Sequence, residues 1–140
     1  MEMRKINKII LHCSDSNNRR YDFDLIRKDH KAKGWSDIGY HFGVDFDGNI
    51  HFLRKVDRVG AHAKGANKDS IGVCVLGKDP DKFTAEQMKS LATLVGSLMI
   101  IFGVTAHDVY GHFELNEFKT CPNFDVAKFI EGPLEDFLCL

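Results

Sequence analysis

The chain has 140 residues and a mass of 15.9 kDa, a size typical of one domain with a substantial core. Its formal net charge is −1, with 19 Lys and Arg spread among 20 Asp and Glu. Nucleic acid binding needs concentrated positive charge, so we expect no nucleic acid partner. No apolar run approaches the roughly 18 residues of a transmembrane helix, so no membrane-spanning segment is expected.

The amino terminus and the four cysteines indicate the cellular compartment in which the protein is made. Residues 1–5 lead into an apolar segment of only a few residues, which is too short for a secretory signal. Without such a signal, the cysteines are predicted to be reduced thiols rather than disulfides. We therefore expect a protein that is made in the cytoplasm. Because the sequence has no repeats and no internal boundary, residues 1–140 are predicted to form a single domain, and we expect a monomer.

The first half of the chain alternates strand and helix signals. Residues 6–12 become continuously apolar, which is typical of a central strand covered on both faces. Asp22 can cap a helix that reaches about Lys33, and Gly34 suits the position after its end. Asp47-Gly48 lies between two β-rich runs and predicts a hairpin.

Alternation within the first of these runs predicts which side chains share a face. The predicted strand places Tyr40, Phe42, Val44 and Phe46 on one face of the sheet and His41 on the other. We expect His41 and His51 to be structural or exposed. His30, on the preceding helix, is predicted to be a half-buried packing residue.

The second half begins with a Gly- and Ala-rich loop over residues 60–69, a kind of segment that is often functional. Residues 70–76 are predicted to form a buried strand. Thr84 opens a capping box, Thr84-Ala85-Glu86-Gln87, and an amphipathic helix is expected to continue to about Phe102. Asp125 can cap a last helix.

Residues 111–122 contain the strongest chemical signal in the chain. His112 and Cys121 are nine positions apart, and imidazole and thiolate are good zinc ligands. The best third candidate is His12, at the end of the first strand. Three protein ligands leave one tetrahedral position open, as in a catalytic zinc site. Cys13 is expected to point to the opposite face from His12 and to be a small buried residue.

Spacing alone leaves a simpler interpretation open. Seven His and four Cys in 140 residues produce some His/Cys proximity by chance. The separation of His12 from His112 does not by itself indicate a shared ligand set.

Five sequence blocks, taken in order, carry a resemblance to a known family, and they extend over nearly the whole chain. They are Leu11-His12-Cys13-Ser14, Gly34-Trp35-Ser36-Asp37-Ile38-Gly39-Tyr40-His41-Phe42, His62-Ala63-Lys64-Gly65, Asn67 with Ser70-Ile71-Gly72-Val73, and Lys119-Thr120-Cys121-Pro122. In these blocks the chain resembles the zinc-dependent N-acetylmuramoyl-L-alanine amidases, the type shared by phage lysozymes and peptidoglycan recognition proteins. The resemblance implies an α/β domain with a mixed central β-sheet flanked by helices and one Zn²⁺ in a surface groove.

The resemblance also implies roles for individual residues. The family's zinc ligands match His12, His112 and Cys121, and its catalytic residues match Tyr40 and Lys119. The resemblance further implies substrate-binding positions at His62 and Asn67. Two departures concern the groove edge: the loop over residues 113–118 is slightly longer than in close relatives, and Phe118 stands where a Pro is common.

The implied function is hydrolysis of the amide between the lactyl group of N-acetylmuramic acid and L-alanine, with peptidoglycan as the partner. A zinc ion held by two imidazoles and a thiolate lowers the pKa of its water, and Tyr40 and Lys119 can stabilise the oxyanion or move the proton. A single catalytic domain suits a phage or prophage endolysin that reaches the cell wall after release. Three alternatives stay open: a non-catalytic peptidoglycan-binding module, a Cys–His hydrolase with Cys121 as nucleophile, and a regulator that binds a host protein such as RNA polymerase.

Overall fold

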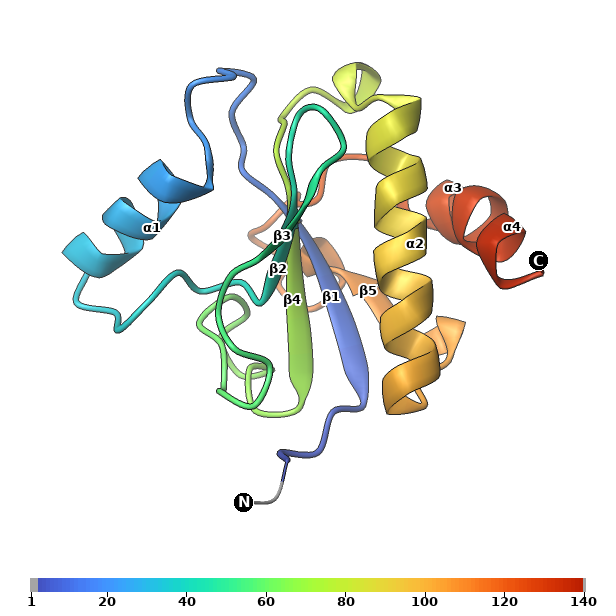
Figure 1. The fold of residues 1–140 in the computed structure, drawn as a ribbon, viewed down its shortest axis with the longest axis horizontal. Helices are drawn as coiled ribbons and strands as arrows, with labels where there is room; N and C mark the ends of the chain where they lie inside the picture. Colours follow the sequence, from blue (N-terminus) through green and yellow to red (C-terminus); the bar gives the residue numbers. More distant parts are fainter. Residues whose placement is uncertain (1–2, 140) are drawn as a thin grey trace.

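A five-stranded mixed sheet forms the centre of the protein (Figure 1). The computed structural model describes residues 3–139. The strand order is β3-β2-β4-β1-β5. β1 is parallel to both β4 and β5, β2 is parallel to β4, and only β3 runs antiparallel to its neighbour β2. The strands are β1 (Lys8–Cys13), β2 (Phe42–Val44), β3 (Ile50–Phe52), β4 (Ser70–Val75) and β5 (Val109–Gly111).

Helices cover both faces of this sheet. Figure 1 shows α1 on one side and α2 on the other, with the C-terminal helices packed outside α2. The last helical segment contains a π-helical turn with Pro133 inside it. The helices are α1 (Phe23–Ala32), α2 (Ala85–Phe102), α3 (Val126–Phe129) and α4 (Glu135–Leu138), with the π turn Ile130–Leu134 between the last two and 3₁₀ turns at Pro80–Lys82, Ala106–Asp108 and His112–Glu114.

Alternation along the central strands divides the core in two. Ile9 and Leu11 of β1 and Val73 of β4 join the large cluster under α2. Cys74, one residue further along β4, belongs to a smaller cluster with Phe23 and other residues under α1. β1 is buried on both faces, because every residue from Ile9 to Cys13 is buried. The sheet is therefore a rigid base for any side chain at its strand ends.

Most of the predicted elements are confirmed. β1 is one residue longer at its end than expected, α1 begins after the Asp22 cap, and the Thr84 capping box opens α2. The Asp47-Gly48 hairpin is present, with Gly48 at φ 84°. His41 is fully buried and structural, as expected, because its ring accepts from the Gly72 amide.

The prediction that Tyr40 and Phe46 share a face with Phe42 and Val44 is wrong. Phe42 and Val44 lie in the cluster under α2, whereas Tyr40 and Phe46 pack against the cluster under α1. Strand β2 covers only three residues, so the regular alternation ends before it reaches Tyr40 or Phe46. The consequence for function is that Tyr40 lies on the α1 side of the sheet.

Within residues 3–139, no helix has both the length and the apolar character needed to cross a membrane.

The capping box of α2 yields a test of the fold. The Thr84 hydroxyl accepts from the Gln87 amide, and the Gln87 side chain accepts from the Thr84 amide. Thr84→Ala should lower the free energy of unfolding by about 1 kcal/mol, the usual loss for a removed N-cap. Chemical denaturation measures this change. Thr105→Ala is the matched control, because Thr105 precedes a 3₁₀ turn without making a cap hydrogen bond; equal losses in the two variants would contradict the assignment.

Candidate active site

Two histidines meet at the carboxyl ends of neighbouring parallel strands. His12 is the fifth residue of β1, and His112 directly follows β5. The pairing of Leu11 with Gly111 brings the next residue of each chain segment to the same level. The two imidazole ring centroids are 4.6 Å apart. The sheet register alone thus brings together residues that are a hundred positions apart in sequence.

The loop after His112 returns Cys121 to the same place. The Phe113 amide donates to the Cys121 carbonyl at 3.0 Å, which closes the loop directly beside His112. Glu114 holds the start of the loop, because its carboxylate accepts from the Gly111 amide at 2.6 Å. The Cys121–Pro122 peptide bond is cis. His112 and Cys121 are therefore neighbours across a closed loop, as their spacing allowed.

Cys13 also reaches this site. It is buried, as expected, but its sulfur lies 3.3 Å from the Cys121 sulfur. Cys121 Sγ also lies 3.8 Å from the Cys13 carbonyl oxygen. The Cys13 thiol lowers the pKa of the Cys121 thiol to about 6 by hydrogen bonding to its sulfur, a direction that Lys119 supports. Cys121 is thus the member of the pair whose deprotonation these contacts favour.

These residues line a cleft of about 430 Å³. Tyr40 and Lys119 lie in its walls together with His12, and the Tyr40 ring centroid is 5.1 Å from that of His12. The sequence-predicted ligands and catalytic residues are therefore gathered in one cleft. The lining residues are His12, Cys13, Ser14, Asp15, His30, Lys33, Trp35, Tyr40, Ala61, His62, His112, Phe118, Lys119, Thr120 and Cys121.

Sequence reasoning missed part of this wall. His30, at the end of α1, lines the cleft rather than only packing, and its Nδ1 accepts from the Gly39 amide at 2.9 Å. The His30 ring lies 4.6 Å from the Trp35 ring, and the Lys33 ammonium lies 5.3 Å from that indole. The position of His30 near the end of a helix, shortly before Gly34-Trp35, was the sequence feature that could have indicated this. Helix periodicity alone does not show which side of α1 faces the cleft.

His62 and Asn67 take different positions around this site. His62 lines the cleft, yet both of its ring nitrogens have protein partners, His12 Nε2 at 2.9 Å and the Ser70 hydroxyl at 3.2 Å. Asn67 does not line the cleft; its side-chain oxygen accepts from the His62 and Ala63 amides. Asn67 therefore holds the loop that carries His62, and substrate binding by either residue stays a prediction.

Burial sets the protonation states in the cleft. It lowers the pKa of His12 well below its ordinary value, and His62, His112 and Lys119 add to the effect. Burial and the Lys119 charge also lower the pKa of His112. In contrast, burial raises the pKa of Tyr40 well above its ordinary value. At neutral pH the cleft therefore presents uncharged imidazoles and a protonated tyrosine hydroxyl.

The donor set fits a zinc ion in its chemistry. Zinc ligands must be unprotonated imidazoles and thiolates, which are the states that the pKa shifts of His12, His112 and Cys121 favour. Among the residues that the structure describes, no three His, Cys, Asp or Glu side chains stand ready-made as a metal site. In this structure His12 Nε2 faces His62, and Cys121 Sγ faces Cys13.

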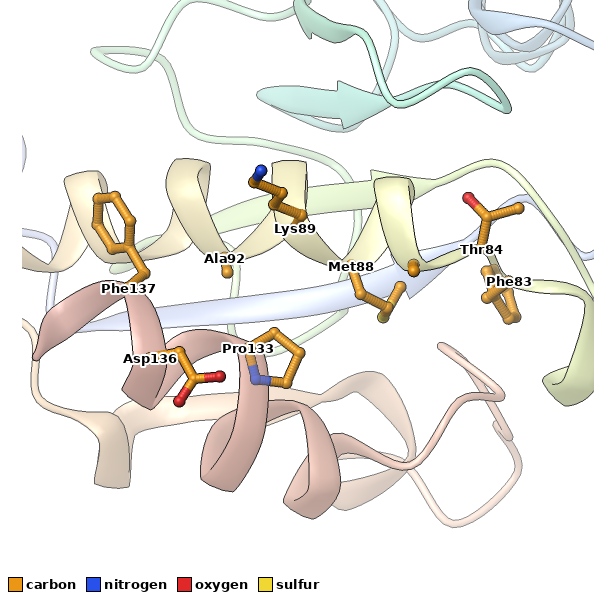
Figure 2. A pocket seen from close by; sticks show the side chains of 9 residues that line it. Phe83, Thr84, Met88, Lys89, Ala92, Pro133, Asp136 and Phe137 are labelled. Carbon is orange, nitrogen blue, oxygen red and sulfur yellow. The ribbon is translucent and has the colours of Figure 1, made fainter. Parts of the chain in front are cut away.

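A second groove lies on the far side of α2 and has a different character. Figure 2 shows it between α2 and the C-terminal helices, with Phe83, Met88, Pro133 and Phe137 among its lining side chains. It has a volume of about 610 Å³. Among the described residues that line it there is no His or Cys.

Known proteins resemble this chain in both sequence and fold. The model of the N-acetylmuramoyl-L-alanine amidase family matches residues 2–124. The endolysin of Escherichia phage T7 is 38% identical over 130 residues, which cover 88% of this chain and 84% of that protein. The endolysin of Klebsiella phage KP32 is 35% identical over 136 residues, covering 91% of this chain and 87% of that protein.

Solved structures agree. The N-acetylmuramoyl-L-alanine amidase LysC from Clostridium intestinale URNW has a TM-score of 0.83 and 33% identity, covering 91% of this chain and 85% of that chain. Drosophila PGRP-LB has a TM-score of 0.80 at 23% identity, covering 94% and 84% of the two chains, a likeness in fold. With a family model matching most of its length and relatives above 30% identity, this protein belongs to the N-acetylmuramoyl-L-alanine amidase family.

Proposed function

We propose that this protein is a zinc-dependent amidase that cleaves the bond between the lactyl group of N-acetylmuramic acid and L-alanine in peptidoglycan. His12, His112 and Cys121 would hold the metal. One observation carries the proposal: three side chains of zinc-ligand type, from β1 and from the two ends of the loop after β5, line one cleft together with Tyr40 and Lys119. To bind the ion, Cys121 would exchange its contact with the Cys13 sulfur for the metal.

The chain's own residues have distinct tasks in this reaction. When bound, a zinc ion supplies Lewis acidity, which activates water and polarises the amide carbonyl. Tyr40 keeps its proton because burial raises its pKa, so its hydroxyl can donate to the developing oxyanion. The Lys119 ammonium adds positive charge on the same cleft wall. Either residue can pass a proton to the leaving amine.

The cleft argues against a glycosidase. Cleavage of a sugar linkage normally uses two carboxylates that flank the bond. Among residues 3–139, Asp15 is the only acidic residue that lines the cleft. The Glu114 carboxylate, two residues after His112 in the sequence, accepts from the Gly111 amide. The side chains present suit attack on an amide instead.

The cleft also argues against a cysteine hydrolase. A nucleophilic cysteine needs a base within hydrogen-bond reach, usually a histidine. Within residues 3–139, the contacts of Cys121 Sγ are with Cys13 and not with a histidine. Cys121 is better suited to be a metal ligand.

The biological setting that we infer is that of an endolysin. The endolysins of phages T7, T3 and KP32 are among the relatives of this chain. We propose that this protein likewise acts on the cell wall after release. The complete set of ligand-type residues separates it from a non-catalytic peptidoglycan-binding module, and no feature of the described residues supports a role in binding RNA polymerase.

The metal requirement is the first prediction. Chelation should abolish activity, and added zinc should restore it, because the ligand set leaves one position open for chemistry. Cys121→Ala should lose zinc yet remain folded, since Cys121 lies on a loop over a complete core. Elemental analysis and circular dichroism measure the two properties.

Cys139→Ala is the matched control for this variant, because Cys139 is exposed and outside the cleft. It should keep both zinc and activity. Purified protein that is active but contains no zinc would refute the metal assignment.

Tyr40 and Lys119 provide the second prediction, which separates chemistry from metal binding. Tyr40→Phe and Lys119→Ala should keep one zinc per chain but lose about 10²–10³ in kcat, the usual effect of removing one transition-state donor. Lys119→Arg should also be poor, since a planar guanidinium does not replace a compact ammonium.

Two surface variants serve as controls for these losses. The Tyr110 hydroxyl bonds to Asp108, outside the cleft, and Lys128 is exposed on α3. Tyr110→Phe and Lys128→Ala should turn over like the parent protein. Near-parental turnover in Tyr40→Phe and Lys119→Ala would mean that the roles assigned to these residues are wrong.

The bond that is cut is the third prediction. Digestion of purified peptidoglycan should release stem peptides that begin with L-alanine and leave intact glycan strands, because the cleft suits amide attack and lacks a carboxylate pair. N-terminal labelling and mass analysis identify the products. A digest with new reducing sugars, or with no fresh alanine amine, would contradict the amidase assignment even if zinc were bound.

A further inference from the structure

A continuous chain of hydrogen bonds leads from His12 into the protein interior. His12 Nε2 lies 2.9 Å from His62 Nδ1, and His62 Nε2 lies 3.2 Å from the Ser70 hydroxyl oxygen. The Ser70 hydroxyl donates to the Ala66 carbonyl at 2.6 Å. Ser70 is fully buried, and His12 and His62 are only 2% and 9% exposed. Solvent therefore does not compete for these bonds.

The His62 ring is held in place from several sides. A Cβ atom on Gly72 would come within 2.5 Å of the His62 ring, and one on Gly60 within 2.7 Å. The ring thus lies directly against backbone at two glycines, which any larger residue would displace. Asn67 fixes the backbone of the same loop by accepting from the His62 amide. The His62 ring is therefore closely packed against the backbone and is not a free side chain in the groove.

The direction of every bond in the chain follows from counting protons. Ser70 has one hydroxyl proton, and it goes to the Ala66 carbonyl, which can only accept. Ser70 must then accept from His62, so the His62 proton is on Nε2. An uncharged His62 has only a lone pair left on Nδ1. His12 must therefore donate through Nε2–H, which leaves its own lone pair on Nδ1.

We propose that Ser70 and His62 are positioning residues that lock His12 in the tautomer with its proton on Nε2, so that Nδ1 is the atom that binds the metal. This proposal rests on the metal site of the proposed function. A metal-binding imidazole commonly donates its other N–H to a protein acceptor, which fixes both the tautomer and the ring orientation. Here the acceptor is another imidazole, whose own tautomer is set one step further by Ser70.

The metal-free parent protein gives the first test. Imidazole ¹⁵N NMR of histidine-labelled protein should show a proton on Nε2 and a lone pair on Nδ1 for both His12 and His62. A His12 proton on Nδ1 would overturn the proposal. Because this spectrum needs no metal, it tests the chain separately from the proposed function: the expected spectrum in a protein that binds no zinc would refute the proposed function alone.

Zinc affinity of variants gives the second test. Ser70→Ala and His62→Leu should weaken zinc binding about 10–100-fold in a chelator competition, the usual effect of removing such a partner. His62→Gln should recover most of the affinity, because one amide can accept from His12 and donate to Ser70. At saturating zinc, Ser70→Ala should keep a KM near the parental value, because Ser70 is fully buried and does not line the cleft.

A matched control and a contrary result complete this test. Ser97→Ala removes a hydroxyl that donates to Thr93 on the outer face of α2 and should leave zinc affinity unchanged. If His62 instead contacts substrate, His62→Leu will raise KM without changing zinc affinity, and that result would overturn the proposal. Thermal unfolding of each variant identifies any that fail to fold. In that case the ¹⁵N NMR spectrum of the parent protein and the zinc affinity of His62→Gln decide the test.

Discussion

The parallel pairing of β1 with β5 is the constraint on which the cleft depends. Leu11 and Gly111 are register partners, so the residues that follow them, His12 and His112, leave the sheet at the same level. A shift of one residue would turn His12 to the α2 face, where the large apolar cluster lies. Because β1 is buried on both faces, such a shift would also turn each of its apolar side chains to the opposite face of the sheet and away from its present packing partners. The same strand register therefore determines both the packing of the core and the position of His12.

Much of this arrangement was predictable from the sequence because local signals had unambiguous physical causes. The Asp22 and Thr84 caps and the Asp-Gly hairpin depend only on a few neighbouring residues, and each is present. The meeting of His12 with His112 was not predictable from spacing, since it depends on which strands pair. It came from the family resemblance, whose ordered motifs contain tertiary information that periodicity lacks.

The limits of the sequence have equally physical causes. Alternation predicts the wrong face for Tyr40, because β2 has only three residues and the alternation ends before Tyr40. Cys13 is buried, as expected, but its sulfur also contacts Cys121, which reaches the strand end from another loop. His30 is half-buried, as expected, but helix periodicity does not show that it also lines the cleft, whose wall is formed by contacts between α1 and the segment before β2. For Cys13 the deciding contact comes from a segment distant in sequence, since Cys121 lies 108 residues away.

The loop after His112 is where the sequence resemblance predicts a departure from the family pattern, and its base shows why such a departure would leave the proposed ligands in place. The Phe113 amide donates to the Cys121 carbonyl, so the loop is closed at its base whatever its length. Between the two ends of the loop, Phe118 is 86% exposed while still lining the cleft. His12, in contrast, lies on the rigid sheet and is held from behind by His62. Changes in the loop can therefore alter what the cleft edge contacts, while the histidine and thiolate donors keep their positions.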